Sequence, residues 1–277
     1  TTEQDVRVLY NDLNKLRPDH VTSYSLTEKK DVWGFQNNEK FGYMRLNFKT
    51  LADRRKVNSI FGYNREYTKY HVYESNLDPV LRLMHRTGIQ STGWLDTGSE
   101  CVRSHLAKVD IDLWCNNWQT LKPVERDDIA PFVVASVDIE CNSSTGKFPN
   151  ADVPGDACFQ IAISLCKFGN DEPYEKTCLC YKKTDGPDVM SFDTEREMLE
   201  AFQKYIQEKD IDIITGWNIF GFDLEYIYKR ALLTNCNEEF FNLGKLRDPP
   251  SELLLKKLSS SALGDNFLKL LPMTGRF

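Results

Sequence analysis

The chain has 277 residues, of which 41% are hydrophobic and 27% charged, which predicts one large or two ordinary packed domains and excludes a disordered polypeptide. A formal net charge of −6 argues against a general nucleic-acid coat protein but suits a site where carboxylates collect metal ions. No apolar run approaches the roughly 20 residues that cross a bilayer, and no signal core opens the chain. We therefore expect an intracellular protein without a membrane partner. Because the sequence lacks an initiator Met, we expect it to be cut from a longer chain.

The first 130 residues predict a mixed α/β domain. Short β-branched or aromatic runs predict strands at residues 21–26, 32–36, 43–48, 71–73 and 109–114, and apolar periodicity predicts helices at 50–61 and 78–87. Seven basic residues between Arg45 and Tyr70 suit either a phosphate-facing patch or an ordinary solvated surface. The polar stretch 116–131, with two prolines, is the candidate domain boundary, so we divide the chain into domains 1–130 and 131–277.

The second domain has clearer signals. Residues 132–139 form a nearly all-apolar run, typical of a strand buried on both faces, and strands are also predicted at 158–168, 177–181 and 211–215. Thr194 and Glu197 form a capping box that begins one amphipathic helix, and a second helix follows residue 223. Three strands, a helix, a strand and a helix predict a mixed sheet with helices on its faces.

The eight cysteines include no C-x-x-C pair, so we expect no structural zinc. The preferred interpretation is reduced, buried cysteines. Cys178 and Cys180, two residues apart in a predicted strand, should share one face.

Two acidic motifs follow predicted strands. Asp138 and Glu140, at the end of the first apolar strand, share one face because side chains alternate along a strand. Two carboxylates in that position suit hard divalent cations, although solvated side chains would explain an isolated pair. The second motif runs from Asn218 to Asp223 and opens a helix. There, Asp223 suits a helix cap as well as a metal ligand, Asn218 an ordinary turn, and Phe222 the core.

The two motifs together resemble those of the replicative family B DNA polymerases, and most closely the DNA polymerase delta branch with its large-DNA-virus relatives. The resemblance is carried by VDIEC at 137–141, DIITGWNIFGFD at 212–223, Phe148-Pro149 and Arg230-Ala231, and upstream by YESN at 73–76 and Gly93-Trp94. It implies a polymerase N-terminal domain followed by a ribonuclease H-like 3′→5′ exonuclease domain. A hairpin is expected within 255–277.

The resemblance also implies a mechanism. Asp138, Glu140 and Asp223 would bind two Mg²⁺ or Mn²⁺ ions that hydrolyse the 3′-terminal phosphodiester of single-stranded DNA. Asp138 would bridge the metals, Glu140 would lie near the attacking water, and Asp223 would hold the second metal. Asn218 would support the site from its edge, Phe222 would pack near the terminal bases, and both would contact the DNA.

The family's last exonuclease motif, a Tyr followed four residues later by Asp, does not occur after Asp223. We therefore expect an exonuclease domain truncated before its last motif, with little or no nuclease activity of its own, and robust Mg²⁺-dependent digestion of DNA would contradict this. The loop around Asp156-Ala157 also departs from the family's usual Asp-Pro pair.

Three other interpretations stay open: a free-standing ribonuclease H-like exonuclease acting on RNA or DNA, a non-catalytic exonuclease-like domain that guides DNA or binds a partner, and an unrelated α/β protein. The implied partners are the single-stranded 3′ end of a primer–template, the remaining polymerase domains and a sliding clamp or other processivity factor. The implied location is the nucleus or a cytoplasmic viral factory.

Overall fold

The structure is a computed structural model that describes residues 3–31, 34–248, 250–261 and 264–276. The backbone forms two compact units, Thr1–Ser91 and Thr92–Phe277, and each is described by itself. The domain division at residue 130 stays a prediction. Within the described ranges, no helix combines the length and apolar character needed to span a membrane.

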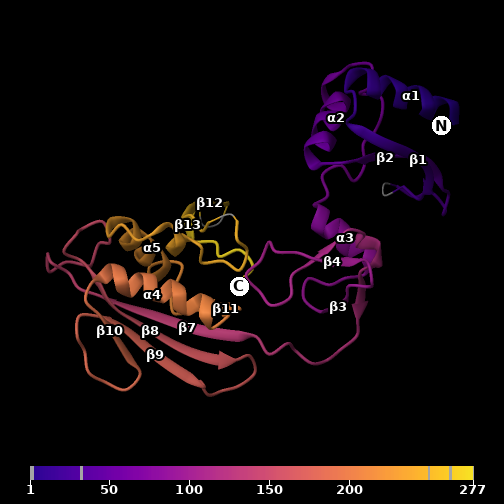
Figure 1. Cartoon of the computed structure of the whole chain (residues 1–277). Coiled ribbons are helices and arrows are strands. Elements are labelled where there is room, and N and C mark those ends of the chain that lie inside the picture. The colour runs from indigo at the N-terminus through magenta and orange to yellow at the C-terminus, as the bar shows by residue number, and fades with distance from the viewer. Residues whose placement is uncertain (1–2, 32–33, 249, 262–263, 277) are drawn as a thin grey trace. The chain divides into compact units, whose positions relative to one another are not determined.

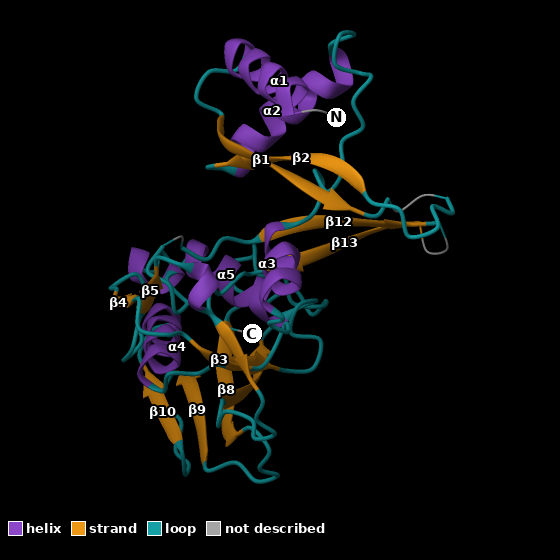
Figure 2. Ribbon diagram, turned by 90° about the vertical axis from the view of Figure 1, so that its right-hand side faces the viewer, coloured by secondary structure: helices purple, strands orange, loops and turns teal. Residues whose placement is uncertain are grey.

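The first unit packs helices against a two-stranded ribbon (Figure 2). Its small core consists of Leu13, Val21, Val57, Ile60 and Tyr67. The elements are α1 (Glu3–Leu16), β1 (Val21–Lys29), β2 (Phe41–Phe48), α2 (Leu51–Tyr63) and α3 (Pro79–Thr87), with β1 antiparallel to β2.

Both predicted helices of this unit are confirmed, because Thr50 and Asp78 accept backbone N–H bonds as N-caps of α2 and α3. Helix α1 was not predicted, although Val6 and Leu13 repeat at helical spacing. The predicted strand at 71–73 is wrong, since these residues have no regular structure. The predicted strand at 32–36 is absent at residues 34–36, and 32–33 lie outside the described residues.

Short antiparallel pairs open the second unit. Strand β3 (Trp94–Asp96) pairs with β6 (Lys122–Val124), and β4 (Cys101–Arg103) pairs with β5 (Leu113–Cys115). The 3₁₀ turn η1 (Trp118–Thr120) lies between β5 and β6 in the chain. Only the last two residues of the predicted strand 109–114 are in a strand. The Trp94 indole N–H donates to the Asp128 carbonyl at 2.7 Å, and the Arg126 guanidinium lies 4.0 Å from the indole ring centre. These contacts fix the stretch 126–128 to β3.

A five-stranded mixed sheet forms the centre of this unit, in the order β10-β9-β8-β7-β11. Strand β7 is antiparallel to β8 and parallel to β11, and β9 is antiparallel to β8 and parallel to β10. The strands are β7 (Val133–Cys141), β8 (Cys158–Lys167), β9 (Glu175–Tyr181), β10 (Val189–Phe192) and β11 (Ile213–Thr215). All but β10 were predicted.

Helices α4 (Glu195–Glu208) and α5 (Asp223–Leu233) lie over one face of the sheet (Figure 1). The capping box is confirmed, with reciprocal Thr194 and Glu197 bonds. The prediction that 132–139 is buried on both faces is wrong, because burial alternates along β7. Alternate residues such as Val137 and Ile139 join the core, whereas Ser136 and Asp138 are exposed on the opposite face.

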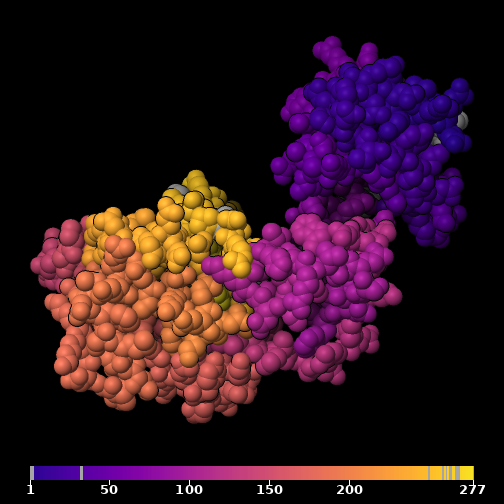
Figure 3. Space-filling model, in the orientation of Figure 1, coloured from indigo at the N-terminus to yellow at the C-terminus, as the bar shows by residue number. Residues whose placement is uncertain are grey.

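The C-terminal segment packs against the start of the same unit, and Figure 3 shows the yellow segment against the magenta one. Ala107 forms an antiparallel bridge with Leu246. The segment contains η2 (Glu238–Phe241) and the antiparallel hairpin of β12 (Leu254–Ser260) and β13 (Gly264–Leu270), which confirms the expected hairpin. The Lys269 ammonium donates to both Glu225 carboxylate oxygens on α5, at 2.8 and 2.7 Å.

All eight cysteines are free thiols. Only Cys158 and Cys180 are buried, so the prediction of burial is wrong for the other six, which are half-buried. Cys178 and Cys180 do share a face of β9, with their sulfur atoms 3.5 Å apart. Burial raises the pKa of the Cys178 thiol to about 11, which keeps it protonated at neutral pH.

Candidate active site

The candidate site lies at the end of β7. Asp138 and Glu140 are exposed on its uncovered face, while Ile139 between them is buried in the core. Their common face, predicted from strand alternation, is confirmed. On β8, Ala162 and Gln160 lie opposite the two acids. The uncovered face therefore presents two carboxylates beside short or neutral side chains, which leaves them accessible to a ligand.

The turn after β11 brings the second motif to the same place. Gly216 permits this approach, because a Cβ atom there would lie 2.4 Å from the Val137 carbonyl oxygen of β7. Asn218 has a left-handed backbone, with φ of 53°, and its carbonyl accepts the N–H groups of Gly221 at 2.8 Å and Phe222 at 3.1 Å. Asn218 therefore forms the turn that leads into α5. Its predicted contact with DNA stays a prediction.

Asp223 is the first residue of α5 and only 3% exposed. Its pKa is raised, mainly by burial and further by the negative charge of Asp138, while the backbone N–H groups of Asp223 itself and of Ile139 oppose the shift. The helix N-terminus also favours a negative charge at this position. Asp138 and Asp223, 85 positions apart, are thus close enough for their charges to interact.

The donor chemistry fits a hard divalent cation, since carboxylate oxygens are its preferred ligands. A cation shared by two nearby carboxylates also relieves the repulsion between their negative charges. Throughout the described ranges, however, no three His, Cys, Asp or Glu side chains gather into a metal-binding arrangement. The structure brings Asp138 and Asp223 together and places Glu140 on the same strand face. The three carboxylates are not close enough together in the structure to form one set of metal ligands.

An aromatic cluster borders the carboxylates. The Phe222 ring is half-buried and lies 5.4 Å from the ring of Phe148 and 5.1 Å from that of Tyr226. Phe148, in the loop between β7 and β8, is 79% exposed. The loop after the first motif and the end of the second therefore contribute adjacent aromatic rings, of which the Phe148 ring is the most exposed.

Sequence reasoning missed the residues that hold this loop. The buried Asp156 carboxylate accepts the Ser144 N–H and hydroxyl at 2.7 and 2.6 Å and the Asn150 N–H at 3.0 Å. The Tyr226 hydroxyl of α5 donates to the Asp156 carbonyl at 2.8 Å. These bonds close the loop that carries Phe148 and attach it to α5. The only sequence signal was a departure from the family's pattern.

A buried ion pair completes the attachment. The Arg230 guanidinium donates to both Glu195 carboxylate oxygens, at 2.7 and 2.6 Å, and both residues are less than 10% exposed. Arg230 also donates to the carbonyls of Ala151, Val153 and Pro154. It therefore ties α4, α5 and the loop together. The signal that could have found it is a charged residue on the apolar face of a predicted helix.

The fold and the site together define a class of protein. Residues 70–269 match the family described as DNA polymerase family B, exonuclease domain. The chain belongs to this family and covers its exonuclease domain region.

Individual relatives agree with this assignment. The chain is 31% identical to a DNA polymerase of Paramecium bursaria Chlorella virus NY2A over 90% of the chain and 28% of the relative. It is 30% identical to a DNA polymerase of Acanthamoeba polyphaga mimivirus over 90% of the chain and 15% of the relative. It is 29% identical to the DNA polymerase delta catalytic subunit of Arabidopsis thaliana over 98% of the chain and 26% of the relative. The chain thus spans less than a third of each of these relatives.

Proposed function

We propose that this chain carries the proofreading 3′→5′ exonuclease centre of a DNA-directed DNA polymerase, built on a ribonuclease H-like core. The centre would hydrolyse the 3′-terminal phosphodiester of single-stranded DNA. The observation that carries the proposal is the close packing of the two motifs, in which Gly216 lies against the Val137 carbonyl next to Asp138, and Asp223 begins the helix that follows. Family membership and the five-stranded mixed sheet support it.

Asp138, Glu140 and Asp223 would hold two Mg²⁺ or Mn²⁺ ions, which when bound would polarise the scissile phosphate and lower the pKa of an attacking water. Burial fixes the Asp223 carboxylate at the helix start, and the exposed strand face gives Asp138 and Glu140 access to a substrate. Phe222, beside the exposed Phe148 ring, would stack against the terminal bases. Asn218 would keep the turn that positions Asp223.

The partners follow from the proposal. Primer–template DNA with a single-stranded 3′ end, the other domains of a polymerase and a processivity factor would all act with this chain. The competing function is a non-catalytic exonuclease-like domain that guides DNA or binds a partner.

Digestion of 5′-labelled single-stranded DNA with Mg²⁺ tests the proposal, using the longest chain that the gene encodes. We expect stepwise shortening from the 3′ end, reduced at least a hundredfold by the double substitution Asp138→Ala/Glu140→Ala. An Asp185→Ala variant, which alters an exposed acid outside the site, should digest normally. If the correctly folded chain does not digest DNA, the non-catalytic function is favoured.

A further inference from the structure

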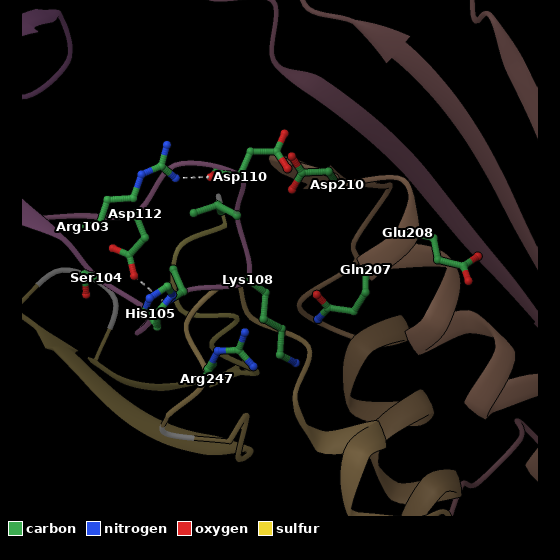
Figure 4. Close-up of a pocket in the computed structure, with 12 residues that line it drawn as sticks. Arg103, Ser104, His105, Lys108, Asp110, Asp112, Gln207, Glu208, Asp210 and Arg247 are labelled. Carbon is green, nitrogen blue, oxygen red and sulfur yellow. Dashed lines mark hydrogen bonds between the residues drawn. The ribbon is translucent and has the colours of Figure 1, made fainter.

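A polar hollow lies within the unit Thr92–Phe277, and none of the proposed metal ligands lines it. Its volume is about 590 Å³, within the roughly 300–1,000 Å³ typical of small-molecule sites. The stretch 103–112, the end of α4 and Arg247 contribute the lining (Figure 4). Lys108 and Arg247 lie at one end, while Asp110 and Asp210 lie toward the opposite side.

The two segments that carry these cations are joined by backbone hydrogen bonds. The Lys108 N–H donates to the Lys245 carbonyl at 2.7 Å, and the Arg247 N–H donates to the Leu106 carbonyl at 2.9 Å. These bonds flank the bridge between Ala107 and Leu246. Two segments more than a hundred residues apart thus contribute a cation each to the lining of one hollow.

The charges of Lys108 and Arg247 are not neutralised. In the described part of the chain neither forms an ion pair, and the Lys108 ammonium contacts only the Asn242 carbonyl, at 3.5 Å. The pKa of Lys108 is lowered by burial and by the positive charges of Arg247 and Arg276, against a smaller opposing effect of Glu239. Neighbouring cations in a partly buried place repel each other, and an anion that binds between them lowers the electrostatic free energy of the site.

Two of the four carboxylates that line the hollow are engaged elsewhere. Asp112 accepts the backbone N–H groups of Leu106 and Ala107 at 2.6 and 3.0 Å, and Asp210 pairs with Lys245 at 2.9 Å. The planar guanidinium of an arginine binds two oxygens of a phosphate at once, and a lysine adds a point charge. We propose that Lys108 and Arg247 form a phosphate-binding subsite, which takes the phosphate of a nucleotide or of a nucleic-acid backbone.

The test is calorimetric titration of the 277-residue chain with inorganic phosphate, thymidine 5′-monophosphate and an oligothymidylate. EDTA in the buffer keeps metal out of the carboxylate site. We expect all three to bind, and the substitution Lys108→Gln/Arg247→Gln to weaken each at least tenfold. The matched control Lys183→Gln/Arg86→Gln removes two exposed cations elsewhere and should change affinity less than twofold.

The comparison of ligands identifies the source of the phosphate. Oligothymidylate binding at least tenfold tighter than the mononucleotide indicates a nucleic-acid backbone, and equal affinities indicate a free nucleotide. Thymidine and acetate should not bind. The proposal is overturned if the folded chain binds no phosphate compound, if acetate binds equally well, or if the double substitution leaves binding unchanged.

A separate readout guards against misfolding. Because the substitution removes repelling cations, its melting temperature without ligand should equal or exceed that of the native chain. Phosphate should raise the melting temperature of the native chain only. If the double variant does not fold, the single substitution Arg247→Gln carries the test, because this side chain is exposed.

Discussion

At the scale of single residues, the site combines positions that stability alone would not select. Asp223 keeps an ionisable group buried beside another carboxylate, and its own backbone N–H, the Ile139 N–H and the helix N-terminus favour its charge. Burying a charge without a counterion costs free energy unless a ligand compensates it. The arrangement is therefore better explained by ligand binding than by folding.

Gly216 gives the sharpest prediction at this scale. A Cβ atom at this position would collide with the Val137 carbonyl oxygen, a backbone atom that cannot rotate away. We expect Gly216→Ala to lower the free energy of unfolding by about 1–3 kcal/mol, as overpacking does elsewhere. Urea denaturation measures this. The control is Gly62→Ala in α2, where a Cβ meets nothing within 4 Å and should be neutral or stabilising. Equal effects of the two substitutions would contradict the account.

At the scale of elements, two helices and one loop are joined by the pair of Glu195 and Arg230. Replacing Arg230 by Met would leave Glu195 buried without its counterion. We expect a loss of about 3–5 kcal/mol in the free energy of unfolding. The matched control is Arg196→Met on α4, whose pair with Glu200 is partly exposed and should cost at most about 0.5 kcal/mol. Chemical denaturation of both variants checks the difference, and similar losses would refute it.

The loop between β7 and β8 predicts a pH dependence. The Ser144 hydroxyl and the N–H groups of Ser144 and Asn150 hold the pKa of Asp156 below its usual value. The stabilisation is therefore fully present above about pH 4, the unfolded-state pKa, and is lost as the pH falls through the folded-state pKa. We expect Asp156→Asn to have a lower free energy of unfolding than the native chain at pH 6. The difference between the two proteins should become smaller below pH 4. Urea midpoints across this range measure it. If this stability difference does not change with pH, or if Asp185→Asn shows the same pH dependence, the charge of Asp156 does not cause the stabilisation.

At the scale of the whole molecule, the contacts of the stretch 92–130 assign it to the same compact unit as the five-stranded sheet. The bridge of Ala107 with Leu246 joins this stretch to the C-terminal segment, and backbone bonds of Lys108 with Lys245 and of Arg247 with Leu106 flank it. The segment 88–93 is mostly exposed and has no regular structure. We expect limited proteolysis to cut there first and to leave a stable fragment that starts near residue 92. A stable fragment starting near residue 131 would instead support the division made from sequence.

Strong local signals allowed much of the sheet unit to be predicted. The apolar run of β7 and the capping box of α4 reflect interactions between neighbouring residues. Resemblance to a family then suggested which acids would meet. The sequence did not reveal the pairing of Glu195 with Arg230 or the bridge at Ala107, because such contacts form only once distant segments are packed. The two-sided burial of β7 was misjudged, since an apolar run does not tell how many faces are covered.

The central claim is that Asp138 and Asp223, from separate motifs, share one divalent-cation site. Mn²⁺ titration of the 277-residue chain, followed by the electron paramagnetic resonance of free Mn²⁺, tests it directly. We predict that the native chain takes up Mn²⁺ and that Asp138→Asn and Asp223→Asn each weaken uptake at least tenfold. The control Asp152→Asn, at an exposed acid paired with Lys229, should behave like the native chain. Equal uptake by all four proteins, or none by the folded native chain, would contradict the claim.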